Sequence, residues 1–363
     1  MSKIKILFTI PNFDTAGSGK VVYDLVKGLD KDKFSPEIAC FHNKGAFFKE
    51  VEQLGVPIHI IPFTTSYKPY ITFLSRVNRI SKFFKKHEFD LVHSWHWSSD
   101  FSEVLAAKIA RVPYVYTKKA MSWGNKAWRI KSRLSTKILV LNSDMIPRFF
   151  SKLKKKTILI HLGVDLTKYS PQKRTRETAL GLQFKESDFV IVTVANLVPI
   201  KGIEYLIQAI EKLNDSNVKL VVVGNNKNEY GQELMQNTIN KNIYFIDKQL
   251  DVRPYHAIAN LFIIPTKTVW EGLPVAPIDA MASQRIVIGS DVEGVNEVLQ
   301  DYPNCLFPAK NVQAICGKIK EIQQLSIEEK EALELQMRKT VEEKFSLLKC
   351  ISEHERFYLN LLK

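Results

Sequence analysis

The segment ANLFIIPTKTVWEGLPVAPIDAMASQRIVIGSD (residues 259–291) has a pattern from which the class of fold can be inferred. Residues 259–266 and 284–291 are short, largely apolar runs, typical of strands that are buried on both faces. The stretch between them predicts a loop and then a helix, because Pro274 and Pro277 are compatible with a helix only before or within its first turn. A strand, a loop, a helix and a second strand predict a parallel sheet covered by helices.

The same alternation of apolar runs and amphipathic stretches extends along the chain. The expected strands are residues 4–10, 35–41, 56–62, 89–95, 112–117, 137–143 and 157–163, and then 189–197, 218–225, 243–248, 261–266 and 284–291. A polar, basic segment separates the two series, so we place a linker near residues 165–187. The tail, residues 327–363, has the pattern of one or two amphipathic helices. The sequence therefore predicts an α/β protein of two doubly wound Rossmann-like domains facing each other across a cleft.

Composition restricts the class of protein. The chain has 363 residues, enough for two domains of average size, and its 45% apolar and 25% charged residues are typical of globular proteins. The four scattered cysteines argue against a disulfide framework or a zinc site and favour a reducing cytoplasm. The apolar run at the start is too short for a secretory signal, and no run reaches the roughly 20 residues of a membrane-spanning helix.

Charge is distributed unevenly along the sequence. Residues 1–170 contain 29 Lys and Arg against 13 Asp and Glu, a net charge of +16, whereas the remaining residues contain 23 against 25, a net charge of −2. Three partners could account for the basic half: nucleic acid, an anionic membrane surface or an acidic small substrate. Segments 73–89, 118–134 and 148–156 mix cations with Trp or Phe, which suits docking on anionic lipid or stacking on nucleic acid. Helices with solvated cations and buried aromatic rings would have the same composition.

One of these segments gives the membrane interpretation a specific form. Lys82, Lys85 and Lys86 share a helical stretch with Phe83 and Phe84. An interfacial role for this helix would therefore involve both the cations and the two rings.

Ligands of doubly wound sheets bind beyond the carboxyl ends of the strands, so the loops there are the candidate site. Gly17, Ser18 and Gly19 follow the first strand, and a helix is expected to begin around Ser18 to Lys20. Glycines allow the backbone to approach an anion, and the helix amides favour negative charge. A tight turn between strand and helix would need the same glycines.

The first loop of the second half contains a lysine in a similar place. Lys201 and Gly202 stand at the start of a helix, after a strand that ends near Ala195. A lysine there would add a point charge to the anion site of the helix amides. Alternatively, Lys201 is a solvated surface lysine.

Two carboxylates flank the loop of the opening segment. Glu271 follows the strand, and Asp279 is expected near the N-terminus of the next helix, where its charge could also serve only to stabilise the helix. Two acids on one strand, loop and helix suit a ligand rich in hydroxyls, because an ionised carboxylate accepts several hydrogen bonds. The amides of Gly272 and Leu273 would face a phosphate.

These motifs together resemble a known family. Residues 270–282 and 287–299 are similar to the E-x7-E signature of the retaining family 4 glycosyltransferases, which have the GT-B fold. Residues 194–209 resemble the family's phosphate-binding strand, loop and helix, residues 161–171 its interdomain linker, and residues 15–29 its glycine-rich first loop. The resemblance implies an acceptor domain at residues 1–168, joined by the C-terminal helix at about 345–363, and a nucleotide-sugar donor domain at residues 169–344.

The resemblance also implies a role for each motif residue. Glu271 would contact the donor sugar, Asp279 the nucleotide ribose, and Lys201 the diphosphate, which makes Glu271 and Lys201 the catalytic pair. The implied donor-binding residues are Gly17, Ser18, Gly19, Asn196, Lys201, Glu271, Gly272, Leu273, Pro274 and Asp279. Such enzymes retain the anomeric configuration and need no metal or other cofactor, because protein cations and helix dipoles stabilise the departing diphosphate. The D-x-D at Asp30–Asp32 follows a helix and is interpreted as a solvated turn.

Three positions depart from the family pattern. Asp279 is one methylene shorter than the usual glutamate, and Asn196 stands where many members have a phosphate-binding arginine. Lys119 stands where members commonly have a histidine, and it cannot reproduce a neutral imidazole. His96, on a neighbouring loop with His93, is a second candidate near the acceptor or sugar.

The leading hypothesis is a cytoplasmic glycosyltransferase, peripheral on the inner face of the cell membrane, that uses a nucleotide-sugar. Its acceptor would be a lipid-linked saccharide or a surface polysaccharide. The three departures keep open a noncatalytic GT-B module that only binds nucleotide-sugars. Nucleic acid is not an expected partner, because no nucleic-acid-reading motif accompanies the charge. The sequence leaves open the base and sugar of the donor, the linkage and the oligomeric state.

Overall fold

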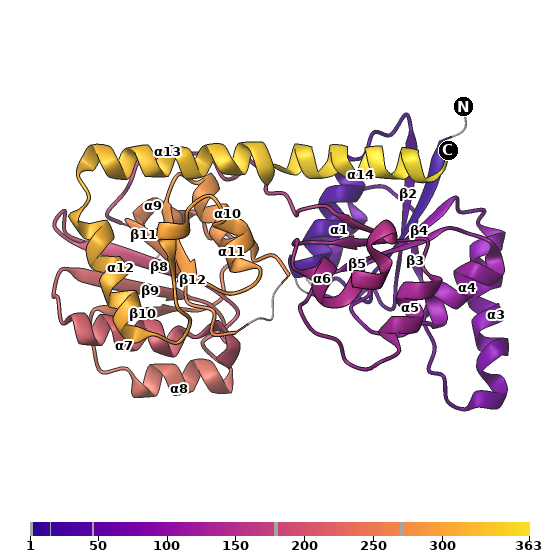
Figure 1. Ribbon diagram of the computed structural model, residues 1–363, viewed down its shortest axis with the longest axis horizontal. Helices are drawn as coiled ribbons and strands as arrows, with labels where there is room; N and C mark the ends of the chain where they lie inside the picture. Colours follow the sequence, from indigo (N-terminus) through magenta and orange to yellow (C-terminus); the bar gives the residue numbers. More distant parts are fainter. Residues whose placement is uncertain (1–2, 15, 46, 178–180, 269–271) are drawn as a thin grey trace. The chain divides into compact units, whose positions relative to one another are not determined.

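The protein forms two compact units, each built around one parallel sheet (Figure 1). The computed structural model describes residues 3–14, 16–45, 47–177, 181–268 and 272–363. The first unit comprises residues 1–163 and 347–363, and the second comprises residues 164–346. The predicted α/β class is confirmed.

The first unit contains a seven-stranded sheet whose strands are all parallel. The strand order is β3-β2-β1-β4-β5-β6-β7. Most strand positions are buried because helices cover the sheet, which explains the unbroken apolar runs of the sequence. The strands are β1 (Ile4–Thr9), β2 (Phe34–Cys40), β3 (Ile58–Ile60), β4 (Leu91–Ser94), β5 (Tyr114–Lys118), β6 (Lys137–Val140) and β7 (Thr157–Leu159).

The C-terminal helix belongs to the first unit. This helix, α14 (Leu347–Leu361), packs against α1 (Ala16–Gly28). Its Tyr358 is fully buried, and the hydroxyl is hydrogen-bonded to Nδ1 of His93 at 2.7 Å. The other ring nitrogen of His93 is 2.8 Å from the Thr117 hydroxyl, so this histidine has a structural role. The remaining helices are α2 (Phe48–Glu52), α3 (Tyr70–Lys86), α4 (Ser102–Ala110), α5 (Trp128–Leu134), α6 (Met145–Phe150) and the 3₁₀ helix η1 (Ser151–Lys156).

The second unit repeats the arrangement with a six-stranded parallel sheet of order β10-β9-β8-β11-β12-β13. The strands are β8 (Phe189–Val194), β9 (Val218–Val223), β10 (Ile243–Ile246), β11 (Leu261–Ile264), β12 (Ile286–Ser290) and β13 (Leu306–Phe307). The helices are η2 (Pro199–Lys201), α7 (Ile203–Leu213), α8 (Glu229–Asn237), α9 (Arg253–Ile258), α10 (Val275–Ala282), α11 (Val295–Val298), η3 (Pro303–Cys305), α12 (Val312–Gln324) and α13 (Ile327–Lys344).

Both sheets reverse their strand order at one point, between β1 and β4 in the first unit and between β8 and β11 in the second. At such a point the connections leave toward opposite faces of the sheet, which opens a crevice beyond the carboxyl ends of the two strands. The loops that follow these four strands are therefore where each unit can hold a ligand.

Helix α10 begins at Val275, as expected, and Asp279 lies one turn into the helix. The structure corrects two expectations. Helix α1 begins at Ala16, before the expected start, and has a kink at Gly17. Phe84 is fully buried, so it cannot contribute to an interfacial face. No helix in the described ranges is long and apolar enough to cross a membrane.

Candidate active site

The loop after β8 is fixed by one glycine. Gly202 has φ +66° and precedes α7, and a Cβ atom on it would lie 2.2 Å from the carbonyl oxygen of Pro265. Both the backbone angle and the close approach demand glycine at this position. Lys201 is the residue before it and is half-buried, so the loop after β11 determines where this lysine stands.

Hydrogen bonds hold the loops after β8 and β11 together. The Lys267 amide donates to the Ile200 carbonyl at 3.0 Å. The Lys267 ammonium lies 2.8 Å from Oε1 of Glu204 in the first turn of α7, and the Tyr230 hydroxyl donates to the other oxygen of that carboxylate. Sequence reasoning missed this cluster, because its members are separated by up to 63 residues.

Lys201 and Pro274, two predicted site residues, line the same small cavity of about 50 Å³. The cavity is bounded by the end of β8, the first residue of α7 and the first residues of α10. Asn196 follows Ala195, a lining residue of this cavity, and is exposed in the loop after β8. The second unit therefore brings Lys201 and Pro274 together at the point where its strand order reverses.

The segment around Glu271 is described only in part. Glu271 lies outside the described residues, so its predicted contact with a sugar stays a prediction. Gly272, Leu273 and Pro274, which follow it, are all buried, and Pro274 occupies the N-cap of α10.

Asp279 is held by a residue that sequence reasoning did not identify. Its carboxylate is hydrogen-bonded to the hydroxyl of Tyr169, and burial together with this carboxylate raises the pKa of Tyr169. The Tyr169 ring lies 6.0 Å from that of His256, and the Tyr169 carbonyl accepts a hydrogen bond from Arg338 at 2.6 Å. Asp279 is thus oriented by the chain that leads into β8, and no pattern in the sequence signals this pairing.

The two glycines of the first loop have different surroundings. A Cβ atom on Gly17 would meet nothing within 4 Å, whereas one on Gly19 would lie 3.0 Å from the Phe13 ring and 3.5 Å from the Phe47 ring. Gly19 is therefore required for packing α1, and Gly17 is the one that borders open space.

Lys119 and Ser18, from loops far apart in the sequence, meet in the first unit. The Lys119 ammonium donates to the Ser18 hydroxyl at 3.1 Å and to the Trp95 carbonyl at 2.5 Å, and it lies 5.1 Å from the Trp97 ring. Burial, together with the positive charges of Lys131 and Lys118, lowers the pKa of Lys119 to about 7. The lysine is thus poised between its charged and neutral forms near neutral pH.

The imidazole of His96 is neutral near neutral pH. Burial and the charges of Lys131 and Lys119 lower the pKa of His96 to about 3. Its ring packs 6.0 Å from Phe41 and 5.8 Å from Phe63, and Nδ1 is buried with no hydrogen-bond partner in the described ranges. The structure therefore places His96 close enough to Lys119 for their charges to interact.

Two further lysines at this end of the sheet were not predicted. Lys118 is buried, donates to the Ser122 carbonyl at 2.7 Å and lies 4.1 Å from the Trp123 ring, and burial lowers its pKa to about 7. Lys131 is also buried, and its ammonium donates to the Ser98 carbonyl at 3.2 Å. Lys118 follows a largely apolar run, residues 112–117, which is a weak signal of burial, whereas the residues before Lys131 give no such signal.

The first unit thus gathers three buried or half-buried lysines at the carboxyl ends of β4 and β5. Glu103 and Asp100 offset part of the charge of Lys131, while desolvation opposes protonation of all three lysines. An incoming anion would stabilise their charged forms, so the arrangement favours binding of a phosphate or carboxylate.

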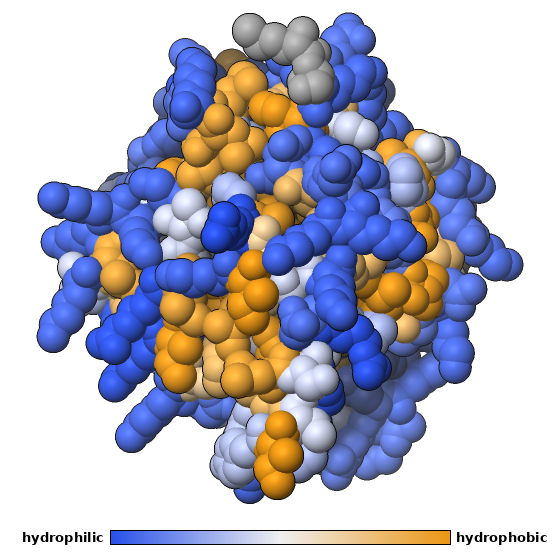
Figure 2. All heavy atoms as spheres, turned by 90° about the vertical axis from the view of Figure 1, so that its right-hand side faces the viewer, coloured by the Kyte–Doolittle hydropathy of each residue, from blue (hydrophilic) through white to orange (hydrophobic). Residues whose placement is uncertain are grey.

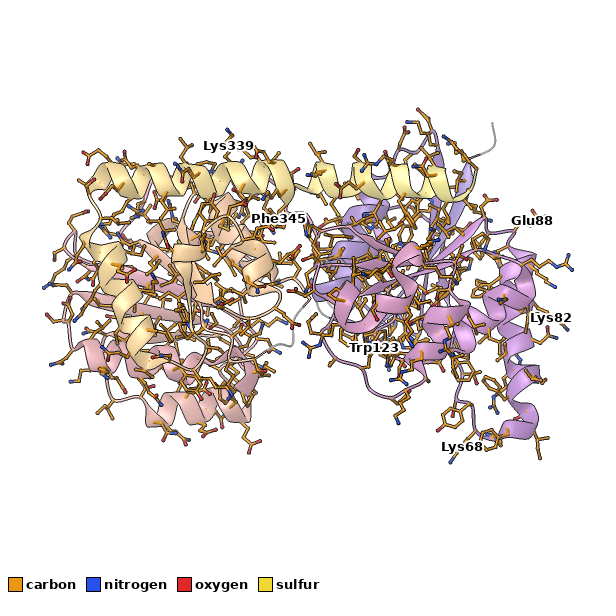
Figure 3. All side chains as sticks on the ribbon, viewed as in Figure 1. Lys68, Lys82, Glu88, Trp123, Lys339 and Phe345 are labelled. Carbon is orange, nitrogen blue, oxygen red and sulfur yellow. The ribbon has the colours of Figure 1, made fainter. Side chains whose placement is uncertain are left out.

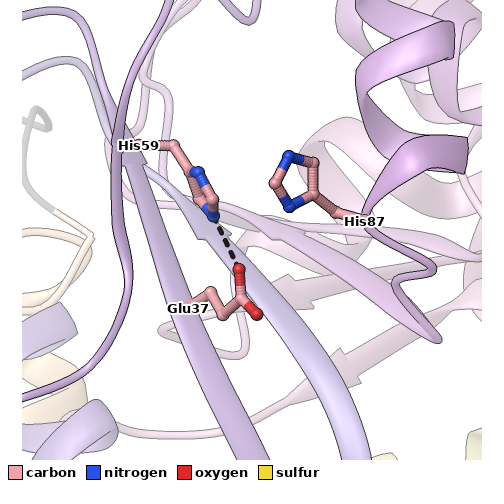
Figure 4. Close-up of side chains that lie close together, drawn as sticks. All are labelled: Glu37, His59 and His87. Atoms are coloured by element: carbon pink, nitrogen blue, oxygen red, sulfur yellow. Dashed lines mark hydrogen bonds and ion pairs between the residues drawn. The ribbon is translucent and has the colours of Figure 1, made fainter.

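A group of metal-capable side chains lies elsewhere in the first unit (Figure 4). Among the residues searched, donor atoms of Glu37, His59 and His87 lie within 4.8 Å of one another. Nε2 of His59 is 2.6 Å from one Glu37 oxygen, and the Lys5 ammonium is 3.0 Å from the other. The carboxylate is thus already bonded on both sides, and the group ties β2, β3 and the end of α3 together.

The D-x-D at Asp30–Asp32 forms a local turn, in which the Asp30 carboxylate accepts a hydrogen bond from the Asp32 amide.

Two family profiles together match most of the chain. The family described as "Glycosyltransferase Family 4" matches residues 15–168, and "Glycosyl transferases group 1" matches residues 176–340. The chain belongs to these GT-B glycosyltransferases. It is accordingly a nucleotide-sugar glycosyltransferase, and nothing in the comparisons supports a noncatalytic binding module.

Two curated relatives resemble this chain over much of its length. The Staphylococcus aureus capsular polysaccharide biosynthesis glycosyltransferase CapH is 24% identical over 84% of this chain and 86% of its own length. The Escherichia coli UDP-Gal:alpha-D-GlcNAc-diphosphoundecaprenol alpha-1,3-galactosyltransferase is 25% identical over 59% of this chain and 61% of its own length.

Solved structures share the fold. A glycosyltransferase from Rickettsia africae matches with a TM-score of 0.86 and 18% identity over 100% of both chains. Anabaena HepE, crystallised with UDP and glucose, matches with a TM-score of 0.79 and 18% identity over 98% of this chain and 99% of its own.

Proposed function

We propose that the glycosyltransferase moves a hexose from a nucleoside diphosphate sugar to a lipid-linked saccharide or a growing surface polysaccharide, as in capsule, O-antigen or lipopolysaccharide synthesis. We further propose that it retains the anomeric configuration and requires no metal. The names of CapH and of the diphosphoundecaprenol-dependent relative support this class of acceptor.

In the proposed donor site, the second unit holds the nucleotide-sugar. Lys201 and the amides at the start of α7 would stabilise the diphosphate, Asp279 the ribose, and Glu271 the hydroxyls of the sugar. Charge stabilisation by a lysine and helix amides is the reason to expect no metal requirement. The observation that carries the proposal is the fixed position of Lys201, since Gly202 tolerates no side chain against Pro265.

The first unit would hold the acceptor. Lys119 and His96 lie at the carboxyl ends of β5 and β4, and Ser18 hydrogen-bonds to Lys119. In this arrangement the lysine would contact a phosphate or carboxylate of the acceptor, and the neutral His96 a hydroxyl.

A transfer assay tests the function directly. Thermal-shift screening with UDP-, GDP-, ADP- and CMP-linked sugars identifies the donor, since a ligand that binds only the folded state raises the melting temperature. The chosen donor is then incubated with a synthetic lipid diphosphate saccharide in excess EDTA. We expect a product with the anomeric configuration of the donor, as read by NMR. An inverted product, or activity that only Mg²⁺ or Mn²⁺ restores, would contradict the proposal.

We also propose that the first unit docks on an anionic membrane surface. This unit has 31 Lys and Arg against 14 Asp and Glu, a net charge of +17, whereas the second has 21 against 24, a net of −3. Figure 2 shows the side of the first unit that carries α3, where apolar side chains lie among hydrophilic ones. The exposed apolar side chains of this region are Tyr67, Tyr70, Ile71 and Leu74.

The expectation that Phe84 takes part is wrong, because this side chain is fully buried. Phe83 is half-buried and packs 4.5 Å from the His87 ring, and its part in docking stays a prediction. A further apolar contribution would come from the beginning of α3, where Ile71 is 97% exposed. Lys68 lies in the loop before this helix, and Lys82 points outward from its other end (Figure 3).

Vesicle flotation tests the docking. Each cation near an anionic surface contributes about 1 kcal/mol, screened over roughly 8–10 Å at physiological salt. Reversing the charge of Lys82, Lys85 and Lys86 should reduce binding to anionic vesicles and leave donor binding intact. The matched control reverses Lys212, Lys241 and Lys320, all exposed in the second unit. Wild-type protein that ignores anionic vesicles at low salt would exclude the docking.

A further inference from the structure

A second hollow of the first unit lies outside the candidate active site. It has a volume of about 440 Å³, within the roughly 300–1,000 Å³ of small-molecule pockets. It lies between α5 on one side and α6 with η1 on the other. Its lining residues are Trp128, Arg129, Arg133, Arg148, Phe149, Ser151, Lys152 and Leu153. None of these residues belongs to the site described above.

The apolar part of this pocket is formed by half-buried side chains. Trp128 stacks on Trp123 with the ring centroids 5.0 Å apart and the planes 5° apart. Phe149 meets Trp128 edge-on at 6.1 Å, and Leu153 adds an aliphatic surface. Because each ring is packed against another, the apolar surface is preorganised and needs little ordering when a ligand binds.

The polar part of the pocket is cationic. Arg129, Arg133, Arg148 and Lys152 are all exposed on its walls. Within the described ranges, Arg129, Arg133 and Lys152 form no ion pair with a carboxylate. Residues 126–156 contain ten Lys and Arg and one acid, so the local charge is strongly positive.

Two of the guanidinium groups are placed beside the rings. Arg129 lies 5.7 Å from the Trp128 ring, and Arg148 lies 5.7 Å from the Phe149 ring. Arginine forms two parallel hydrogen bonds with a phosphate and can stack on an aromatic ring at the same time. Cations next to an apolar surface match a ligand in which a phosphate is attached to a hydrocarbon.

We propose that this pocket binds the diphosphate group of a polyprenyl-linked acceptor, with the arginines on the phosphates and the first carbon atoms of the chain against Trp128, Phe149 and Leu153. The proposal rests on the proposed function, since it names where the lipid-linked acceptor is anchored. A compact headgroup suits this bounded hollow better than an extended polynucleotide.

Binding of farnesyl diphosphate, followed by isothermal titration calorimetry, tests the pocket without requiring sugar transfer. The variant is Arg129→Gln with Arg133→Gln, and the matched control is Lys154→Gln with Lys155→Gln, which removes the same charge from exposed residues that do not line the pocket. We expect at least a tenfold loss of affinity in the arginine variant and less than a twofold change in the control. An unchanged circular dichroism spectrum and an unchanged melting temperature show that the first unit of the variant is folded.

Farnesol and inorganic diphosphate separate the two parts of the ligand. Both should bind more weakly than farnesyl diphosphate. Inorganic diphosphate that binds as tightly would overturn the proposal in favour of a simple anion site, and so would an equal loss in the lysine control. Competition by a single-stranded oligonucleotide at the same affinity would overturn it in favour of nucleic acid.

Failure of the pocket and failure of the proposed function give different results. A tenfold loss in the arginine variant supports the pocket even if the protein transfers no sugar to lipid acceptors. Conversely, transfer to a lipid diphosphate saccharide with the same KM in wild type and variant overturns the pocket and leaves the transferase function standing.

Discussion

Each unit has a candidate anion site at the point where its strand order reverses, but the two sites attract anions by different means. In the second unit, backbone geometry forms the site where the strand order reverses: Gly202 lets the loops after β8 and β11 touch, and Lys201 stands just before α7. In the first unit, side chains supply the positive charge at the corresponding point. Lys118 is the last residue of β5, and Lys119 follows it.

Because of this difference, the two sites should depend on different properties, one on loop conformation and the other on lysine protonation. A site made by helix amides and a backbone contact depends on the loop conformation, so it fails when the backbone is disturbed. A site made by desolvated lysines depends on their protonation, so it responds to pH. The two units should therefore respond to different perturbations.

The largest effect is expected from disturbing the backbone of the second unit. Gly202→Ala combines a positive φ with a contact of 2.2 Å to a carbonyl oxygen, which should destabilise that unit by roughly 2–5 kcal/mol and abolish donor binding. Gly55 has the same φ of +66° and open space around it, so Gly55→Ala should cost only about 1–2 kcal/mol. Thermal unfolding of both variants measures the difference. Equal losses would show that the approach to Pro265 does not matter.

A smaller effect is expected from removing the positive charge of Lys201, which precedes Gly202. Lys201→Ala should weaken nucleoside diphosphate binding by roughly 1.5–3 kcal/mol, the scale of a hydrogen bond to a charged group. Asn196 is uncharged and cannot compensate. Lys212→Ala, in the last turn of α7 where the side chain is exposed, is the control and should have no effect. Calorimetric affinity that is unchanged in Lys201→Ala would place the phosphate site elsewhere.

The smallest effect is expected from pH and belongs to the first unit. Lys119, whose pKa is about 7, is charged below that pH, where it would attract an anionic acceptor, and it is neutral above it. The value of kcat/KM should thus fall as pH rises through 7, by about tenfold per pH unit for a lysine that contacts the anion.

An arginine in place of the lysine supplies the matched control for this pH effect. Lys119→Arg stays charged throughout the range and should flatten the profile. A profile that is identical in wild type and Lys119→Arg would remove Lys119 from the acceptor site.

The fold could be predicted because its signal is local. Strands covered on both faces must be apolar throughout, so each one is visible as a short run. One limit remains: strand β13 has only two residues, Leu306 and Phe307, too few to form a pattern. The start of α10 could be predicted, because both prolines had to lie before or within the first turn, and Pro277 is the third helical residue.

The site could be predicted only where a residue type is rare in its position. Gly202 and Lys201 stand out at a strand–helix junction. The partner of Asp279, Tyr169, lies 110 residues earlier in a segment without periodicity, and only the folded chain brings them together. Lys131 resembles a solvated lysine in the sequence, and its ammonium is buried against carbonyl groups of the loop after β4.

Turnover and nucleoside diphosphate binding, compared between wild type and Glu271→Gln, test the assignment of the donor site. If the second unit holds the donor with Glu271 at the sugar, turnover should fall by roughly 10²–10³-fold, the scale of one lost transition-state contact. The affinity for the free nucleoside diphosphate, which has no sugar, should stay within about twofold of wild type, since Lys201 and the start of α7 are unchanged. Equal losses in turnover and diphosphate affinity, or no loss in turnover, would contradict this assignment of the donor site.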